Sequence, residues 1–385
     1  MKVLVLGGAG WIGSIIVRGL AEMSTFSEVI IGDIAESKCK QLIDQIRNEK
    51  LSFKHVDVTN KSELIKTMKD VDVVVNATWY EFCLKITEAA IAAGVNIVDL
   101  GGMPELTLRQ LELDSQAKNA GITNVIGCGE TPGISNVLAK YGANKLDVIN
   151  EIRIRDGEIG KSSFCWLQHS VRTSMEELTS EAIIYENGEY KKVPPRTGEE
   201  RYKFPNPIGE QICYYVPCEE VITFPRFLGK PLKTVDMKVT ISPELVRIFD
   251  ALEKLGVTKR EPIKFKGVDI SPLDFVVACI RSVPMEQKTS KSYSCIVVDM
   301  TGTKDGNSVR FVLSAMMEDY DKWGVDGEGY KTAMPAAIAA NMLACNEIKA
   351  KGVLPPEACI DPESFLEKLK NKDLKISVEE RKIDQ

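Results

Sequence analysis

Residues 1–130 alternate between short apolar runs and longer amphipathic segments. Runs rich in valine, isoleucine and leucine are typical of strands buried in a parallel sheet, and the segments between them are typical of helices. Strands are expected at residues 2–6, 29–32, 52–58, 71–75, 96–100 and 122–126. This alternation predicts a doubly wound α/β sheet of the Rossmann type, in which ligands bind beyond the carboxyl ends of the strands.

The second half of the chain has a different pattern, in which β-type runs are joined by hairpin signals. Asn187-Gly188 separates two short runs, and Asp305-Gly306 lies between two longer ones. An Asn-Gly pair flanked by strand-like residues is a strong type I′ turn signal. Residues 131–330 are therefore expected to form a separate α+β domain with a mainly antiparallel sheet, which would supply a substrate wall and a dimer surface.

The last part of the chain, residues 331–385, begins with an alanine-rich segment. A helix is expected at residues 332–351, with Pro335 in its first turn and Gly352 at its end. Because alanine side chains permit close packing, this helix is expected to return against the N-terminal domain, residues 1–130. A cleft between the two domains would follow.

A glycine-rich loop comes after the first expected strand. Gly8, Gly10 and Gly13 form the G-x-G-x-x-G pattern, with Trp11 and Ile12 inside it. In this pattern the first glycine permits a tight turn, the second lets a pyrophosphate approach the backbone, and the third lets the helix pack close to the sheet. The helix N-terminus then offers N–H groups to the phosphates. The loop predicts a dinucleotide site.

Asp33 lies at the end of the second expected strand. A carboxylate there accepts hydrogen bonds from the ribose hydroxyls and repels the 2′-phosphate of NADP, so NAD is the expected cofactor. Lys38 is near enough to reach a 2′-phosphate, which keeps NADP open. Asp57 is either an adenine neighbour or a turn residue. The further expected contacts are Asp57 and Val58 at adenine, and Asn76 and Ala77 at the second ribose.

Composition narrows the class of protein. The 385 residues carry a net charge of −6, which argues against a nucleic-acid surface, because phosphate binding needs clustered lysine and arginine. No apolar run is long enough to span a membrane, and no signal peptide is recognised, so a cytoplasmic protein is expected. The ten cysteines contain no Cys-x-x-Cys pair and there are only two histidines, so no metal site is expected.

Several segments carry a likeness to a known family through their order and spacing, although none is specific alone. They are residues 74–82 (Val-Val-Asn-Ala-Thr-Trp-Tyr-Glu-Phe), 98–102 (Val-Asp-Leu-Gly-Gly), 130–136 (Glu-Thr-Pro-Gly-Ile-Ser-Asn), 174–178 (Ser-Met-Glu-Glu-Leu), 187–188 (Asn-Gly), 221–225 (Val-Ile-Thr-Phe-Pro), 334–340 (Met-Pro-Ala-Ala-Ile-Ala-Ala) and 351–357 (Lys-Gly-Val-Leu-Pro-Pro-Glu). Together they resemble the saccharopine reductase and lysine 6-dehydrogenase family along nearly the whole chain.

The resemblance implies an NAD(P)-dependent enzyme of lysine metabolism that oxidises a C–N bond of an amino acid or reduces the imine, and a homodimer. Residues 130–133 (Glu-Thr-Pro-Gly) depart from the Leu-Asp-Pro-Gly of saccharopine reductases and look closer to lysine 6-dehydrogenases. Residues 99–102 also resemble the lysine dehydrogenase branch. The expected partner is therefore a small amino-acid substrate, with lysine or a lysine adduct leading.

Amine oxidation needs a hydride acceptor, a base for the nitrogen proton and an anchor for the substrate carboxylate. By resemblance, Tyr80 is expected beside the nicotinamide as a hydrogen-bonding or proton-relay group. Asp99 and Glu130, at strand ends, are candidates to hold the substrate ammonium, and Cys128 lies beside the expected site. Each has a structural alternative: a half-buried aromatic for Tyr80, a capping or ion-pair role for the carboxylates, and a small buried residue for Cys128.

Arg172 and Arg226 are candidate clamps for the substrate carboxylate, because arginine makes bidentate pairs with carboxylates. The alternative for each is a solvated surface arginine. His169 is either a base or a histidine satisfied within a sheet. Two other functions stay open. One is a carboxynorspermidine-type reduction of a polyamine imine, and the other is a non-catalytic NAD-sensing Rossmann protein that turns over no amine.

Overall fold

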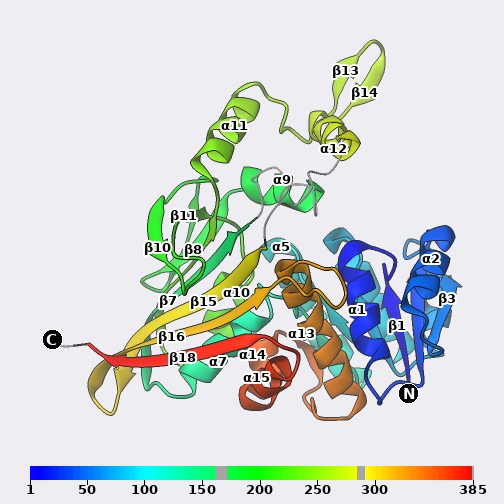
Figure 1. The fold of residues 1–385 in the computed structure, drawn as a ribbon, viewed down its shortest axis with the longest axis horizontal. Helices are drawn as coiled ribbons and strands as arrows, with labels where there is room; N and C mark the ends of the chain where they lie inside the picture. Colours follow the sequence, from blue (N-terminus) through cyan, green and yellow to red (C-terminus); the bar gives the residue numbers. More distant parts are fainter. Residues whose placement is uncertain (161–170, 284–290, 384–385) are drawn as a thin grey trace.

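The computed structural model describes residues 1–160, 171–283 and 291–383 (Figure 1). His169, a candidate base in the sequence, lies outside the described residues.

The N-terminal half is built on a sheet that, within the described ranges, has seven strands, all parallel. Its order is β17-β6-β5-β4-β1-β2-β3. The order reverses between β1 and β4, which places the topological switch point there. The predicted doubly wound α/β class is confirmed. The strands are β1 (Lys2–Leu6), β2 (Glu28–Asp33), β3 (Leu51–His55), β4 (Val73–Asn76), β5 (Asn96–Asp99), β6 (Thr123–Val125) and β17 (Gly352–Leu354).

Helices cover both faces of this sheet (Figure 1). The first, α1 (Trp11–Ala21), buries Ile15, Ile16, Val17 and Leu20, which are the apolar positions of its helical repeat. The segment between β5 and β6 forms two helices, α5 and α6. The helices and one 3₁₀ turn of this half are α2 (Glu36–Ile46), α3 (Lys61–Met68), η1 (Tyr80–Phe82), α4 (Cys83–Ala93), α5 (Pro104–Leu111) and α6 (Asp114–Asn119).

The second half is built on a mixed sheet of nine described strands, in the order β10-β11-β12-β7-β15-β16-β18, with β8 and β9 added at β12. Of the pairs described, β12–β7 is parallel and the others are antiparallel. The strands are β7 (Val148–Ile159), β8 (Ala182–Glu186), β9 (Glu189–Val193), β10 (Glu200–Lys203), β11 (Glu210–Tyr215), β12 (Leu232–Thr240), β15 (Tyr293–Lys304), β16 (Asn307–Glu318) and β18 (Lys375–Lys382).

Both hairpin signals of the sequence are confirmed. Asn187 and Gly188 connect β8 to β9 with φ of 53° and 86°. Asp305 and Gly306 connect β15 to β16 with φ of 51° and 77°. Two consecutive positive φ values are what a type I′ turn requires, and asparagine, aspartate and glycine are the residues that tolerate them.

Helices and a small hairpin complete the second half. The hairpin of β13 (Ile263–Phe265) and β14 (Val268–Ile270) lies on an arm with α11 and α12, at the top of Figure 1. The helices are α7 (Ile134–Ala143), α9 (Val171–Thr179), α10 (Glu220–Phe227), α11 (Pro243–Lys254), α12 (Pro272–Ser282), α13 (Gly327–Ala344), α14 (Pro356–Cys359) and α15 (Pro362–Lys370).

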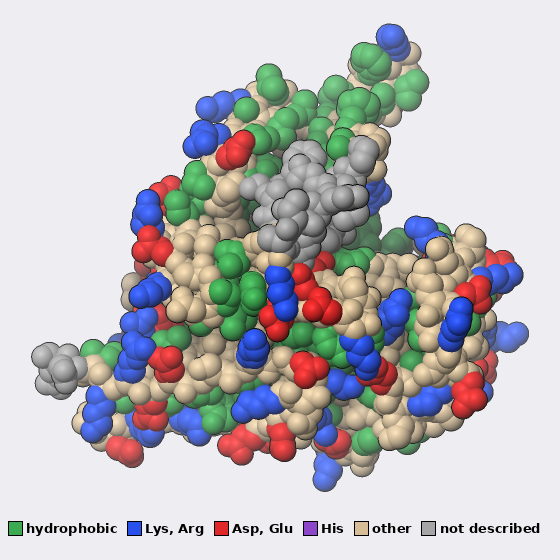
Figure 2. All heavy atoms as spheres, in the orientation of Figure 1, with side chains coloured by type: hydrophobic (Ala, Val, Ile, Leu, Met, Phe, Trp, Pro, Cys, Tyr) green, Lys and Arg blue, Asp and Glu red, His purple; other side chains and the backbone are tan. Residues whose placement is uncertain are grey.

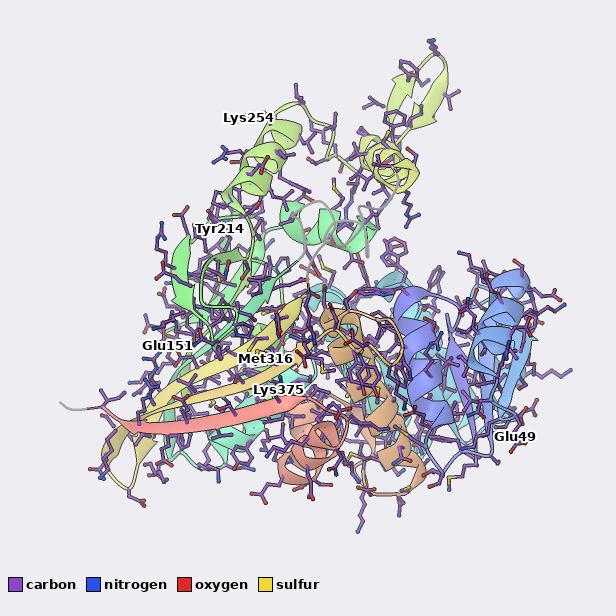
Figure 3. The ribbon with its side chains drawn as sticks, viewed as in Figure 1. Glu49, Glu151, Tyr214, Lys254, Met316 and Lys375 are labelled. Atoms are coloured by element: carbon purple, nitrogen blue, oxygen red, sulfur yellow. The ribbon has the colours of Figure 1, made fainter. Side chains whose placement is uncertain are left out.

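The last long helix differs from its sequence prediction, which was wrong at both ends. α13 begins at Gly327, because Asp326 caps it by accepting a hydrogen bond from Gly329 N at 2.8 Å. It ends at Ala344, and Asn346 with φ of 56° turns the chain away. The remaining segment adds β17 to the first sheet and β18 to the second. Figure 3 labels Met316 and Lys375, which pair where β16 meets β18.

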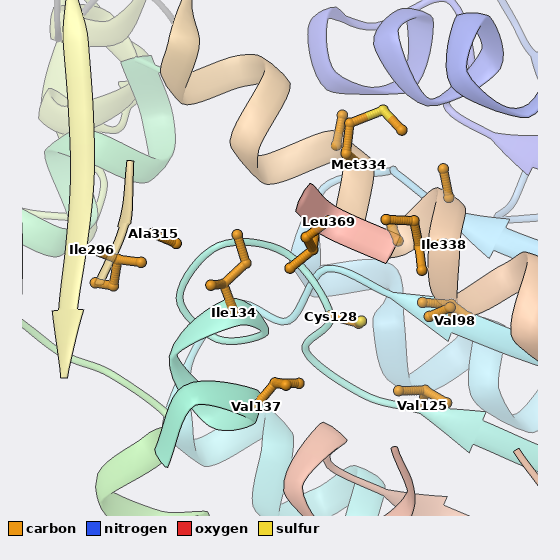
Figure 4. Close-up of a cluster of buried hydrophobic side chains, with 14 of the residues drawn as sticks. Val98, Val125, Cys128, Ile134, Val137, Ile296, Ala315, Met334, Ile338 and Leu369 are labelled. Atoms are coloured by element: carbon orange, nitrogen blue, oxygen red, sulfur yellow. The ribbon is translucent and has the colours of Figure 1, made fainter. Parts of the chain in front are cut away.

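The two sheets share one hydrophobic core. Figure 4 shows Val98 and Val125 of the first sheet near Ile338 of α13, and Ile296 and Ala315 of the second sheet on the far side of the same cluster. α13 packs against α1, so it joins the two halves. No helix in the described part of the chain is long and apolar enough to cross a membrane.

Candidate active site

A cleft of about 1240 Å³ lies between the two halves. The space-filling view is hollowed between the arm and the N-terminal half (Figure 2). One wall comes from the carboxyl ends of β1, β4 and β5 and the loop after β6, and the other from β7, α9, α12 and α13. This is the place where open parallel sheets bind their ligands.

The glycine loop forms the cofactor end of the cleft. Gly7 has a φ of +69° and donates its N–H to Gly32 O at 2.8 Å, and Gly10 N donates to Gly7 O at 3.0 Å. The tight turn after β1 is therefore made by Gly7, and the assignment of that turn to Gly8 was wrong. A Cβ at Gly13 would lie 2.1 Å from Gly7 O, so only glycine lets α1 pack this close to the strand.

These residues fit a dinucleotide. Gly10 and the first turn of α1, with Trp11 and Ile12, line the cleft, and no side chain caps the helix. The partial positive charge of the helix N-terminus is thus directed at the place where a pyrophosphate would lie. Asp33 closes the loop, because its Oδ2 accepts a hydrogen bond from Ala9 N at 3.1 Å.

The other predicted cofactor residues divide into two groups. Ala77 lines the cleft, and its place beside the second ribose stays a prediction. Asn76 is buried instead, and its Oδ1 accepts hydrogen bonds that hold the turn after β4. Asp57 accepts from the backbone and the hydroxyl of Thr59, which is the turn role left open in the sequence. Val58 packs against the hydrophobic core beside β3.

Tyr80 and Glu130 are the two predicted catalytic residues that line the cleft. Tyr80 is 7% exposed, and its ring lies 5.2 Å from that of Trp79. A Cβ at Gly102 would lie 2.2 Å from the Cβ of Tyr80, so a glycine is needed for the tyrosine to take this position.

Glu130 forms a buried ion pair with Lys331 of α13. Burial raises the pKa of the Glu130 carboxyl well above its usual range, and repulsion by Asp156 raises it further, while the Lys331 ammonium opposes both. A buried carboxyl group at the edge of a cleft, with a raised pKa and a cation beside it, is a candidate for proton transfer.

Asp99 and Cys128 do not line the cleft. Asp99 is buried and ties two loops together, because its Oδ1 accepts hydrogen bonds from Gly101 N and Gly127 N at 3.0 and 2.8 Å. Cys128 lies in the hydrophobic cluster of Figure 4. Burial raises the pKa of both side chains, which disfavours the reactive thiolate of Cys128. The hydrogen bonds of Asp99 to two backbone N–H groups favour a structural role for this aspartate.

Of the two candidate arginines, one lies in the cleft and the other does not. Arg172 lines the cleft, 5.4 Å from the ring of Trp79, and is held by ion pairs with Glu176 and Asp274. Arg226 is exposed near the end of α10 and does not line the cleft.

The described lining of the cleft is strongly acidic. Seven of its residues carry carboxyl groups, against two arginines, Arg172 and Arg281. The carboxyl residues are Glu130, Asp156, Glu158, Glu177, Glu219, Asp274 and Glu328. Burial, together with repulsion by Glu328 and Asp156, raises the pKa of Glu177 to about 8.

Sequence reasoning missed most of this acidic wall. Asp156 and Glu177 come from a strand and a helix of the second half, and Lys331 and Glu328 from α13. No local pattern in the sequence marks Lys331, because its partner Glu130 lies about 200 residues earlier in the chain. In the described residues, no group of three histidine, cysteine or carboxylate side chains is arranged to hold a metal ion.

Comparison with known families gives the relationship. Residues 3–125 match the saccharopine dehydrogenase NADP binding domain, and residues 129–374 match the saccharopine dehydrogenase C-terminal domain. The chain belongs to the saccharopine dehydrogenase family. It is therefore a saccharopine dehydrogenase-like oxidoreductase that binds NAD(P), and the resemblance found in the sequence is confirmed.

Individual relatives cover the whole chain. The carboxyaminopropylagmatine dehydrogenase of Synechocystis sp. is 24% identical over 96% of this chain and 95% of its own length. The carboxynorspermidine synthase of Vibrio alginolyticus is 25% identical, covering 97% and 95%. Among solved structures, saccharopine dehydrogenase (L-Glu forming) from Saccharomyces cerevisiae aligns over the full length of both chains with a TM-score of 0.76 and 18% identity. These relatives act on substrates that contain amino groups.

Proposed function

We propose that this chain is an NAD(P)-dependent oxidoreductase for the C–N bond of a carboxylated polyamine, working as an imine reductase or in the reverse direction. The observation that supports it is the excess of carboxyl groups in the described lining of the cleft, seven against two arginines. This is the carboxynorspermidine-type alternative that the sequence left open, and it now stands ahead of lysine and saccharopine.

Substrate charge separates the candidates. Saccharopine carries three carboxylates, which an acidic cleft would repel. Lysine carries one carboxylate and two ammonium groups. A carboxylated triamine carries one carboxylate and several ammonium groups, so it gains most from an acidic wall with few cations. The names of two relatives, carboxynorspermidine synthase and carboxyaminopropylagmatine dehydrogenase, agree with this class.

The residues have distinct roles in this proposal. Bound NAD(P) would accept or donate the hydride at its nicotinamide. Tyr80 and Gly102 form the surface beside that ring, and Arg172 and Arg281 are the cations available for the substrate carboxylate. The acidic wall of Asp156, Glu158, Glu177 and Glu328 would hold the ammonium groups.

The test is a change in reduced-nicotinamide absorbance with NAD or NADP and a panel of amines. A rise in reduced-nicotinamide absorbance with carboxynorspermidine, and no rise with saccharopine, supports the proposal. A rise in absorbance with lysine or saccharopine alone overturns the proposed substrate class. The chain would then be an amino-acid dehydrogenase. Tight NADH binding with no turnover of any amine would make the chain a sensor. Comparing NAD with NADP in the same assay tests the preference inferred from Asp33.

The homodimer and the cytoplasmic location inferred from the sequence stay proposals. Sedimentation of the purified chain tests the first, and a monomer at micromolar concentration would overturn it.

A further inference from the structure

One buried acidic group of the cleft, Glu130, is paired with a buried cation. Lys331 is 0% exposed and Glu130 is 5% exposed, and the two form an ion pair. The Lys331 ammonium also lies 3.9 Å from Asp156 Oδ1. Glu130 lines the cleft, whereas Lys331 does not. The carboxyl group can therefore contact a substrate, and the ammonium acts only through it.

Titratable groups from β7, α13 and β15 surround the Glu130–Lys331 pair. Glu130 faces Asp156 of β7 and Glu328 of α13, both of which raise its pKa after burial has done so. Cys295 of β15 lies near Lys331 and is itself buried. Lys331 is the cation among these groups, so it is the one that favours the ionised form of Glu130.

Burying a charged ammonium group costs free energy of solvation, which nearby carboxylates must offset. Burial lowers the pKa of Lys331, and the neighbouring carboxylates more than restore it, so the lysine stays charged. Apart from the two carboxyl groups, Lys331 Nζ has no hydrogen-bond partner in the described part of the chain. A buried pair of this kind contributes little to stability compared with apolar packing, so its presence at a cleft indicates a role in the chemistry.

We propose that Glu130 takes the proton from the substrate nitrogen, and that Lys331 is the positioning residue that keeps the carboxylate ionised and directed into the cleft. This rests on the proposed C–N oxidoreductase function and names its proton-transfer group. Asp99 and Cys128 are excluded because they do not line the cleft, and Glu219 because it accepts the N–H of Gly102.

Oxidation begins with the removal of a proton from the substrate nitrogen. The N–H bond of the substrate ammonium breaks, and its proton forms an O–H bond with Glu130, which leaves a neutral amine. The amine then loses a hydride from the adjacent carbon to NAD(P)⁺, so the substrate becomes an iminium ion and the nicotinamide is reduced. In the reduction direction the protonated Glu130 returns the proton to the newly formed amine.

Two substitutions and a matched control test the pair. Lys331→Met removes the cation with little change in volume, and Glu130→Gln removes the proton acceptor. Lys322→Met is the control, because the Lys322 side chain is 61% exposed, pairs with Glu22 and does not line the cleft. The double variant Glu130→Gln/Lys331→Met removes both charges of the Glu130–Lys331 pair, and it controls for folding through its melting temperature and NADH binding.

The readout is the pH dependence of kcat/KM for amine oxidation. The wild type is expected to lose activity as pH falls and Glu130 becomes protonated. Without the cation, Lys331→Met moves this acidic limb upward by roughly one to three pH units, the effect of an opposite charge at contact distance. Glu130→Gln abolishes the limb and lowers the rate by about 10²–10⁴-fold. Lys322→Met follows the wild-type profile.

The outcomes separate this inference from the proposed substrate. An unshifted limb in Lys331→Met, or a limb retained in Glu130→Gln, overturns the proton-transfer assignment whatever amine is used. Turnover of lysine or saccharopine alone overturns the carboxylated-polyamine substrate, and the same pH test is then run with that amine. If no amine is turned over, both the proposed oxidoreductase function and the proton-transfer role of Glu130 are overturned.

Discussion

At the scale of single residues, the cofactor end of the cleft depends on three glycines spaced three apart. Gly7 takes a left-handed conformation, and Gly10 and Gly13 approach its carbonyl oxygen. A Cβ would lie 3.1 Å from that oxygen at Gly10 and 2.1 Å at Gly13. The first distance needs a small adjustment and the second needs a shift of the backbone. The two glycines therefore serve different purposes, one for the ligand and one for the fold.

Substituting each glycine with alanine should separate these purposes. We expect Gly13→Ala to lower the free energy of unfolding by about 1–3 kcal/mol, the usual cost of an added methyl group in a packed site. Gly10→Ala should keep nearly wild-type stability and lose NADH affinity, because its methyl group would occupy the approach of the pyrophosphate. Urea denaturation and NADH fluorescence titration measure the two effects. Equal losses of stability in both variants would contradict this division.

The sequence predicts residues whose role is local and misses those whose role depends on distant partners. The glycine loop and Asp33 are recognised because their spacing sets their geometry. Asp99 and Cys128 also follow strands, but successive side chains point to opposite sides, so a position at a strand end does not ensure access to the cleft. Lys331 is invisible because its partner, Glu130, is brought to it only by tertiary packing.

At the scale of elements, α7, α10 and α14 meet around two buried carboxyl groups, for which the structure describes no cationic partner. Glu220 of α10 accepts hydrogen bonds from Thr131 Oγ1 and Ser135 Oγ, each at 2.6 Å. Glu357 of α14 accepts from Asn136 Nδ2 of α7 at 2.8 Å. Burial raises the pKa of Glu357 to about 7. The junction therefore packs most favourably when its carboxyl groups are protonated.

The stability of this junction should fall as pH rises. Glu357 keeps its proton in the folded state up to a pKa of about 7 but loses it near 4.5 when unfolded. Stability is therefore greatest below the lower value and is lost as pH rises through the folded pKa, by roughly 3 kcal/mol at about 1.4 kcal/mol per unit. We expect Glu357→Gln, which keeps an acceptor for Asn136, to flatten the decline between pH 5 and pH 8. Parallel urea midpoints for both proteins across that range would refute this origin.

At the scale of the whole molecule, the C-terminal segment connects both sheets. The Rossmann sheet and the hairpins were predictable because each repeats a local pattern. β17 was not, since it has three residues and no periodicity, and β18 was not, since it is an edge strand rich in charge. Both are specified by the strands they join, β6 and β16. The C-terminal segment thus adds an edge strand to each of the two sheets.

This connection should make the two halves unfold together, although chains of this length commonly unfold in stages. The core is continuous across both sheets, and α13 packs on α1 where a Cβ at Gly19 would lie 3.0 Å from Met334 Sδ. We expect Gly19→Val to destabilise the contact by about 1–3 kcal/mol. Hydrogen exchange read by peptide mass spectrometry along a urea series should then show equal shifts of midpoint for β1 and for β15. Ala92→Val, on the exposed face of α4, provides the same β-branched change without that contact and should move neither peptide appreciably. A shift confined to β1 would mean that the halves are independent, because only then would damage to α1 fail to reach the second sheet.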